Sequence, residues 1–217
     1  MKFVVNGISI IRRGIEIMTE LEIRARVEAN KKEIISLLET VKRPGIDKLI
    51  EWLCKHDYFT APASTMYHSN YEGGLAQHSL NVYRVLKAKA EHYTDLNMPL
   101  ESVIICGLLH DLCKVNFYVT STRNKKNEIT GRWEQVPFYK VDDQVPLGHG
   151  EKSIIILSSF INLTLDEMYA IRAHMGGYEP KENWNTVSGC WNKNKWGVLL
   201  HTADLEASYL YEKHIEY

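Results

Sequence analysis

One apolar stretch that ends in two ionisable residues constrains this chain more than any other feature. Val103 to Leu109 is strongly hydrophobic and is typical of a buried helix or strand, and His110 and Asp111 follow it directly. Ionisable side chains beside a core are costly unless they are paired or bound to a metal ion. His110 and Asp111 can bind one metal ion together if a helix ends or tightens there, so that both side chains turn to the same cavity. Taken alone, the pair is also compatible with a hydrogen-bonded histidine at a helix C-terminus.

The composition is that of an ordinary globular chain. It has 217 residues, 45% of them hydrophobic, which is enough for one large domain or two small ones. Because 26 basic residues oppose 27 acidic ones, we expect no binding along long duplex nucleic acid. No apolar run reaches the roughly 18 residues of a membrane span. The cysteines form no C-x-x-C pair and are typical of reduced thiols, so we expect a cytoplasmic protein with no membrane partner.

Helical periodicity covers most of the chain after residue 18, and two capping boxes mark helix starts. Thr19 with Glu22 begins the first helix, and Thr164 with Glu167 begins a later one. Further helices are expected to begin near residues 46, 75, 100, 149 and 195. Residues 178–194 are rich in Asn and Trp, and we predict a loop there.

We expect a single globular unit, in which an N-terminal extension and helix (1–44) precede the functional domain (45–217). Pro44-Gly45 breaks the first helix and separates the two. Met18 stands just before that helix and is a candidate start, so residues 1–17 should be dispensable for folding and activity.

Residues 115 to about 145 depart from the helical pattern. Two stretches rich in aromatic and β-branched residues favour strands, and the polar segment Arg123–Asn127 separates them. This predicts a β-hairpin inserted in a mainly α-helical fold. We interpret its basic tip as a solvated turn, with an arm that contacts phosphate as the alternative.

Six His and Asp residues lie beside apolar surfaces, in or at the ends of different predicted helices. They are His78, His110, Asp111, His149, His174 and Asp204. In a helical bundle, each inward helix can donate one or two ligands to a central metal. Imidazole and carboxylate suit Mn, Fe, Co, Ni or Zn, and Mg is also compatible. Six ligands exceed one tetrahedral zinc site and fit two divalent ions that share a carboxylate, roughly 3.5 to 4 Å apart.

This order of His and Asp residues resembles the HD-domain superfamily of metal-dependent phosphohydrolases, which fold as helical bundles. Three segments carry the resemblance: YHSNYEGGLAQHS (67–79), LLHDLCK (108–114) and HTAD (201–204). The first is similar to the HD domain of the 3′-to-5′ exoribonucleases of Gram-positive bacteria. Those enzymes carry a nucleic-acid-binding domain before it, and residues 1–44 are too short to supply one. We therefore expect a nucleotide or a short oligonucleotide as substrate.

The resemblance implies a ligand set for each of two metal ions. The first ion would be held by His78, His110, Asp111 and Asp204. Asp111 would bridge to the second ion, which His149 and His174 would complete. His201, three residues before Asp204, is expected to be a hydrogen-bonded structural histidine.

The same resemblance implies hydrolysis of a phosphodiester or phosphomonoester by a metal-activated water. Asp111 would orient the metals, and Lys114 would neutralise charge that develops on the phosphoryl oxygens. His68 would protonate the leaving oxygen or contact the substrate. Two alternatives stay open: a catalytically silent metal- and nucleotide-binding regulatory module, and an HD-type di-iron oxygenase, which O2 consumption would reveal.

Overall fold

The computed structural model of the protein describes residues 3–5, 8–10, 20–65, 69–127 and 130–212. Near the N-terminus, strands β1 (Phe3–Val5) and β2 (Ile8–Ile10) pair antiparallel. Thr19 and most of the predicted extension lie outside the described residues, so the first capping box and the dispensability of residues 1–17 stay predictions.

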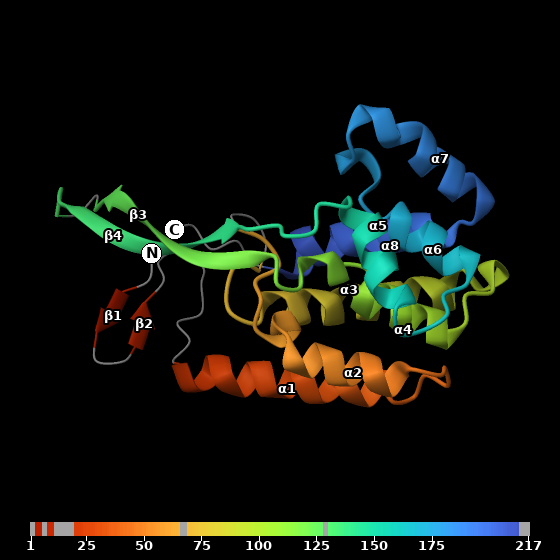
Figure 1. The fold of residues 1–217 in the computed structure, drawn as a ribbon, viewed down its shortest axis with the longest axis horizontal. Helices are drawn as coiled ribbons and strands as arrows, with labels where there is room; N and C mark the ends of the chain where they lie inside the picture. The colour runs from red at the N-terminus through yellow and green to blue at the C-terminus, as the bar shows by residue number, and fades with distance from the viewer. Residues whose placement is uncertain (1–2, 6–7, 11–19, 66–68, 128–129, 213–217) are drawn as a thin grey trace.

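Helices make up most of the described chain, as the sequence predicts, and short 3-10 turns join several of them. The α-helices are α1 (Glu20–Leu38), α2 (Ile46–Lys55), α3 (Gly74–His92), α4 (Leu100–Leu109), α5 (His149–Ser158), α6 (Leu165–Arg172), α7 (Trp184–Lys193) and α8 (Trp196–Glu206). In Figure 1, α3 and α4 lie between α1 and α2 on one side and α5, α6 and α8 on the other. The mainly α-helical fold class is therefore confirmed. The boundary placed at residue 45 stays a prediction.

The core is built around α4, whose apolar run leads directly into His110 and Asp111. Residues 102 to 109 are all buried, because α1, α3 and α6 pack against this helix. Gly107 permits the close approach of α3, since a Cβ atom there would lie 2.7 Å from the Cα atom of Tyr83. The helices that carry His78 and His110 are thereby held at a short, fixed separation.

A buried ion pair joins the α1–α2 connection to α6. Thr164 caps α6, and Glu167 completes the predicted capping box, which is confirmed. The Glu167 carboxylate also accepts two hydrogen bonds of 2.7 Å from Arg43 and one of 2.7 Å from the hydroxyl of Ser102 on α4. Three segments far apart in sequence therefore meet at one carboxylate with no exposed side-chain surface.

The predicted loop over residues 178–194 is wrong, because most of it is helix α7. Asn, Ser and Gly weaken the helical signal of this segment in sequence. Tertiary contacts override that weakness, since Val187 and Cys190 are buried against Ala173, and Trp191 packs beside them.

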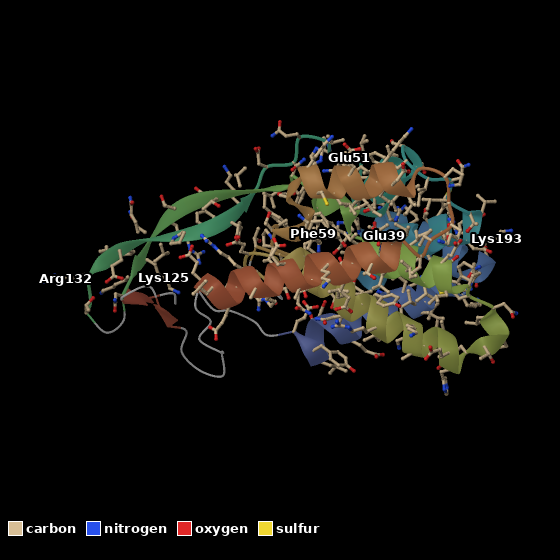
Figure 2. The ribbon with its side chains drawn as sticks, turned by 90° about the horizontal axis from the view of Figure 1, so that it is seen from below. Glu39, Glu51, Phe59, Lys125, Arg132 and Lys193 are labelled. Carbon is tan, nitrogen blue, oxygen red and sulfur yellow. The ribbon has the colours of Figure 1, made fainter. Side chains whose placement is uncertain are left out.

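The predicted β-hairpin is confirmed between α4 and α5. Strands β3 (Tyr118–Lys126) and β4 (Trp133–Val141) pair antiparallel, in a register that sets Tyr118 opposite Val141 and Lys126 opposite Trp133. The hairpin projects well beyond the helices in both views (Figure 1, Figure 2). Among the described residues, no helix has the length and apolar character to cross a membrane.

Candidate metal centre

The end of α4 brings two adjacent side chains into one cluster. The α-helix stops at Leu109, His110 caps it, and a 3-10 turn η3 (Leu112–Lys114) follows. In a continuing α-helix the two neighbours would point about 100° apart. The break at Asp111 (φ −98°, ψ 23°) removes that constraint, and both His110 and Asp111 are buried. This meets the condition under which the two can share a metal.

The structure brings all six predicted ligands together around the Asp111 carboxylate. Its Oδ1 atom lies 2.7 Å from Nε2 of His149 and 3.5 Å from Nε2 of His174. Its Oδ2 atom lies 3.6 Å from Nε2 of His78 and 3.6 Å from Nε2 of His110. Each carboxylate oxygen therefore faces a different pair of histidines.

The ligand atoms also fall into overlapping groups that can each hold one ion. Asp204 on α8 joins the cluster through its Oδ1 atom, 3.2 Å from Nε2 of His78. Three groups have ligand atoms within 4.8 Å of one another: His78 with His110 and Asp111, His110 with His174 and Asp204, and Asp111 with His149 and His174. Asp111 belongs to the first and the last.

Hydrogen bonds on the outer ring nitrogens fit these histidines for metal binding. Nδ1 of His110 lies 3.1 Å from the carbonyl oxygen of Gly107, and Nδ1 of His174 lies 2.6 Å from that of Ile171. Because a carbonyl only accepts, Nδ1 carries the proton and Nε2 carries the lone pair. Both Nε2 atoms are buried without a hydrogen-bond partner in the described part of the chain. A buried polar atom without a partner lowers the stability of the folded protein by about 1–3 kcal/mol, and a divalent ion bound to these Nε2 atoms would supply the missing partner.

His78 is held by a carboxylate that sequence reasoning missed. Its Nδ1 atom lies 2.9 Å from Glu212, which also accepts hydrogen bonds from Ser69 (2.7 Å) and Asn81 (3.2 Å). The Glu212 side chain is only 1% exposed. A carboxylate behind a metal-ligating imidazole fixes its tautomer and ring orientation. Glu212 belongs to no motif, and no signal in the sequence separates it from a surface glutamate.

In the metal-free cluster the imidazole of His110 is neutral, whereas that of His78 carries a proton that a metal ion would displace. Burial lowers the pKa of His110 to about 3, so its imidazole is neutral, as a ligand must be. Burial alone would raise the pKa of Asp111, but Lys114 and the neighbouring histidines together outweigh it and hold that pKa well below its ordinary value. Burial would lower the pKa of His78, but Glu212 and Asp204 outweigh it and raise that pKa to about 10.

Lys114 lies inside the cluster. Its Nζ atom is 2.6 Å from Oδ2 of Asp111, and its side chain is 14% exposed. Asp111 therefore has a cation on the same oxygen that faces His78 and His110. His68, the other predicted catalytic residue, lies outside the described residues, and its role stays a prediction.

Two further side chains support the predicted ligands from behind. Nδ1 of His201 donates to the carbonyl oxygen of His174 at 2.6 Å, which matches the structural role expected for it. Gly176 makes room for the His201 ring, since it has φ 54° and a Cβ atom there would collide with the imidazole. Cys113, which sequence reasoning left among the core thiols, places Sγ 3.4 Å from Nδ1 of His149.

Comparison with known families agrees with this geometry. The sequence profile of the HD domain matches residues 75–196, which is more than half of the chain, and the protein belongs to the HD-domain family. HD domains bind divalent metals and are generally those of metal-dependent hydrolases, although some members are non-catalytic. Comparison with curated proteins gave no significant match, and neither did comparison with solved structures. The matched segment includes five of the six predicted ligands, whereas Asp204 lies beyond it and is placed in the cluster by geometry.

Proposed function

We propose that the protein hydrolyses a phosphodiester or phosphomonoester of a nucleotide or short oligonucleotide, with two divalent metal ions as cofactors. The observation that carries this proposal is the arrangement around Asp111. One oxygen faces His149 and His174, and the other faces His78 and His110. A carboxylate that bridges two cations needs this arrangement.

In this proposal each ion has its own histidines and shares one carboxylate. His78, His110 and Asp204 would hold one ion, His149 and His174 would hold the other, and Asp111 would bind both. Divalent ions bound there would lower the pKa of a water molecule and polarise a phosphoryl oxygen. The mixed imidazole and carboxylate donors favour Mn, Fe, Co, Ni or Zn, with Mg compatible.

The protein's own groups would bind and orient the substrate. Lys114 is nearly buried and adds a fixed positive charge beside Asp111, where a phosphoryl oxygen would gain negative charge during hydrolysis. Glu212 and the backbone carbonyls of Gly107 and Ile171 keep three imidazoles in the ligating tautomer. The nucleotide part of the proposal is supported by the similarity of residues 67–79 to exoribonuclease HD domains.

Metal-dependent hydrolysis of two chromogenic esters tests the proposal. Protein stripped with a chelator is refilled with Mn, Fe, Co, Ni, Zn or Mg and assayed on bis(p-nitrophenyl) phosphate and on p-nitrophenyl phosphate. Preference for the diester would point to oligonucleotides or cyclic nucleotides, and preference for the monoester to a nucleotidase reaction. Turnover should fall at least 100-fold in Asp111→Asn, which keeps the side-chain shape, while circular dichroism stays unchanged.

A matched histidine pair separates the site from general effects of substitution. His149→Gln should lose turnover, whereas His92→Gln, which changes an exposed histidine on α3, should keep it. Two bound ions per chain without hydrolysis of either ester under any metal would overturn the proposal. O2 consumption by the iron-loaded protein would then identify an oxygenase, and its absence would favour a regulatory module.

A further inference from the structure

The hairpin β3–β4 is joined at both ends to the metal centre. Strand β3 begins at Tyr118, four residues after Lys114, and the chain that leaves β4 leads to His149, the first residue of α5. The two attachments are tied together, because the backbone N–H of Cys113 donates to the hydroxyl of Ser153 on α5 at 3.0 Å. At the base, the Tyr118 hydroxyl donates to the carbonyl oxygen of Ala63 at 3.3 Å. The hairpin therefore starts at the site.

From this base the hairpin extends far from the helices. Each strand has nine residues, which at about 3.4 Å per residue makes an arm roughly 30 Å long. Figure 2 shows Lys125 and Arg132 at the end that lies farthest from the helices. At that end, the Trp133 indole is 70% exposed. An indole this exposed on a projecting arm does not contribute to the core, and it is available to stack on a binding partner.

The two faces of the hairpin differ in chemistry, as the strand register shows. We call one of them the Trp133 face; it carries mainly aromatic, hydroxyl and amide side chains. Its members are Tyr118, Thr120, Thr122, Asn124, Lys126, Trp133, Gln135, Pro137, Tyr139 and Val141. Lys126 stands directly opposite Trp133 at the outer end. No carboxylate of the described residues forms an ion pair with Lys126.

Two of the three cations on the opposite face have neighbours within the hairpin. Arg123 lies over the ring of Phe138, 5.4 Å from its centroid, and Lys125 stands opposite Glu134. The third cation of that face, Lys140, is exposed but lies near the base of the hairpin, opposite Val119. Beside Trp133 at the outer end, the cations are therefore Lys126 and Arg132.

Charge distribution sets the hairpin apart from the remaining chain. Residues 118–141 hold five basic and two acidic residues, whereas the whole chain holds 26 and 27. A basic arm with exposed aromatic and amide side chains is complementary to a chain of phosphates that carries unpaired bases. A duplex hides its base faces, so stacking on an indole requires a single strand.

We infer that the Trp133 face binds single-stranded nucleic acid and leads it to the metal centre. One base stacks on Trp133, and neighbouring phosphates contact Lys126 and Arg132. This inference rests on the proposed function, because it names the substrate as an oligonucleotide longer than the site itself.

Fluorescence anisotropy with metal-free protein tests the inference independently of hydrolysis. The probes are fluorescein-labelled single-stranded DNA and RNA of about 12 nucleotides and a duplex of the same sequence. At about 3.4 Å per nucleotide they span roughly 40 Å, which is more than the length of the arm. The wild type should bind both single strands more tightly than the duplex. Trp133→Ala should weaken binding about tenfold, which is the loss expected for one stacked base.

Two lysine variants with the same charge change separate docking on one face from general attraction. Lys126→Gln should weaken binding and lower the salt dependence by about 0.7 in log–log slope, as for one lost phosphate contact. Lys125→Gln, on the opposite face, should bind like the wild type. Thermal unfolding midpoints equal to that of the wild type would show that each variant is folded.

Distinct results would overturn the inference. Equal losses of affinity in the two lysine variants would show that the arm attracts nucleic acid only through its overall charge. An absence of binding by the wild type would refute the inference. A self-association that sedimentation detects, and that Trp133→Ala abolishes, would make the arm a contact between copies instead. Single-strand binding without hydrolysis of any ester would leave this inference standing while the proposed function fails. Equal affinity for single-stranded DNA and RNA would show that the arm recognises phosphates and bases alone. A preference for either would show that it also contacts the sugar.

Discussion

Replacement of Glu212 should weaken metal binding although this residue is not a predicted ligand. The carboxylate is buried and accepts hydrogen bonds from Ser69, His78 and Asn81. Glu212→Gln keeps the shape and most of these bonds and removes only the charge. A charged hydrogen bond contributes about 1.5–3 kcal/mol and a neutral one about 0.5–1.5, so the difference between the midpoints is about 1.2 kcal/mol, or nearly tenfold in affinity. Glu212→Ala removes the acceptor altogether, and the loss should approach 100-fold, the upper end for such partners.

Competition between the protein and a chromogenic chelator for Co or Zn measures these affinities. Glu206→Gln is the matched control, because Glu206 pairs with Lys89 at 2.6 Å and touches none of the predicted ligands. Thermal unfolding of the metal-free variants checks that they are folded. A folded Glu212→Ala variant with wild-type affinity for metal would refute the reasoning, since it would show that His78 needs no support from this carboxylate.

Three further predictions concern stability. Glu167→Gln should cost about 3 kcal/mol in urea unfolding, because it breaks a buried pair with Arg43. Burial would raise the pKa of Glu167, but Arg43, Thr164 and Ser102 together outweigh this and lower that pKa below 4.5. The stabilisation is therefore complete above pH 4.5 and is lost as the pH falls further. The stability of the wild type should therefore decline more steeply in acid than that of the variant, and parallel curves would contradict the assignment. Gly107→Ala should lower stability by about 1–3 kcal/mol and also weaken metal binding, because it forces α3 and α4 apart. Gly189→Ala, where a Cβ atom meets open space on α7, should be neutral or stabilising in the same assay. Metal at 100 times its dissociation constant should add about 2.7 kcal/mol of stability. A chelator should reverse this gain, and Asp204→Asn should reduce it; an unchanged gain in that variant would remove Asp204 from the ligand set.

The clustering of the six predicted ligands could be anticipated from the sequence, because each lies in or at one end of a predicted helix beside apolar residues, in an order that resembles the HD-domain family. That they bind metal stays a prediction. His110 and Asp111 follow a run that had to be buried, so their own burial could be inferred from local sequence alone. The hairpin was predictable for a similar reason, since its β-branched and aromatic residues contrast with the helices on either side. The roles assigned to these residues in catalysis stay predictions.

The remaining features depend on contacts between distant segments, which local patterns do not encode. Glu212 reaches a histidine 134 residues earlier in the chain, and Arg43 reaches a carboxylate 124 residues later. Helix α7 forms because a few side chains are buried, although its Asn, Ser and Gly content is typical of a loop. The difference between the hairpin's faces follows from register, and a shift by one residue would have reversed it.

The wide spacing of the cluster along the chain has a consequence for protein synthesis. Asp111 leaves the ribosome 101 residues before Glu212, which at about 5–20 residues per second is a delay of roughly 5–20 s. During that interval His78 and His110 are already made, whereas Asp204 and the carboxylate that orients His78 are not. A complete binding site therefore cannot exist on the nascent chain until α8 has emerged and docked. Metal selection should accordingly wait until α8 and Glu212 have been made and have docked, when the folded cluster can discriminate between ions by geometry.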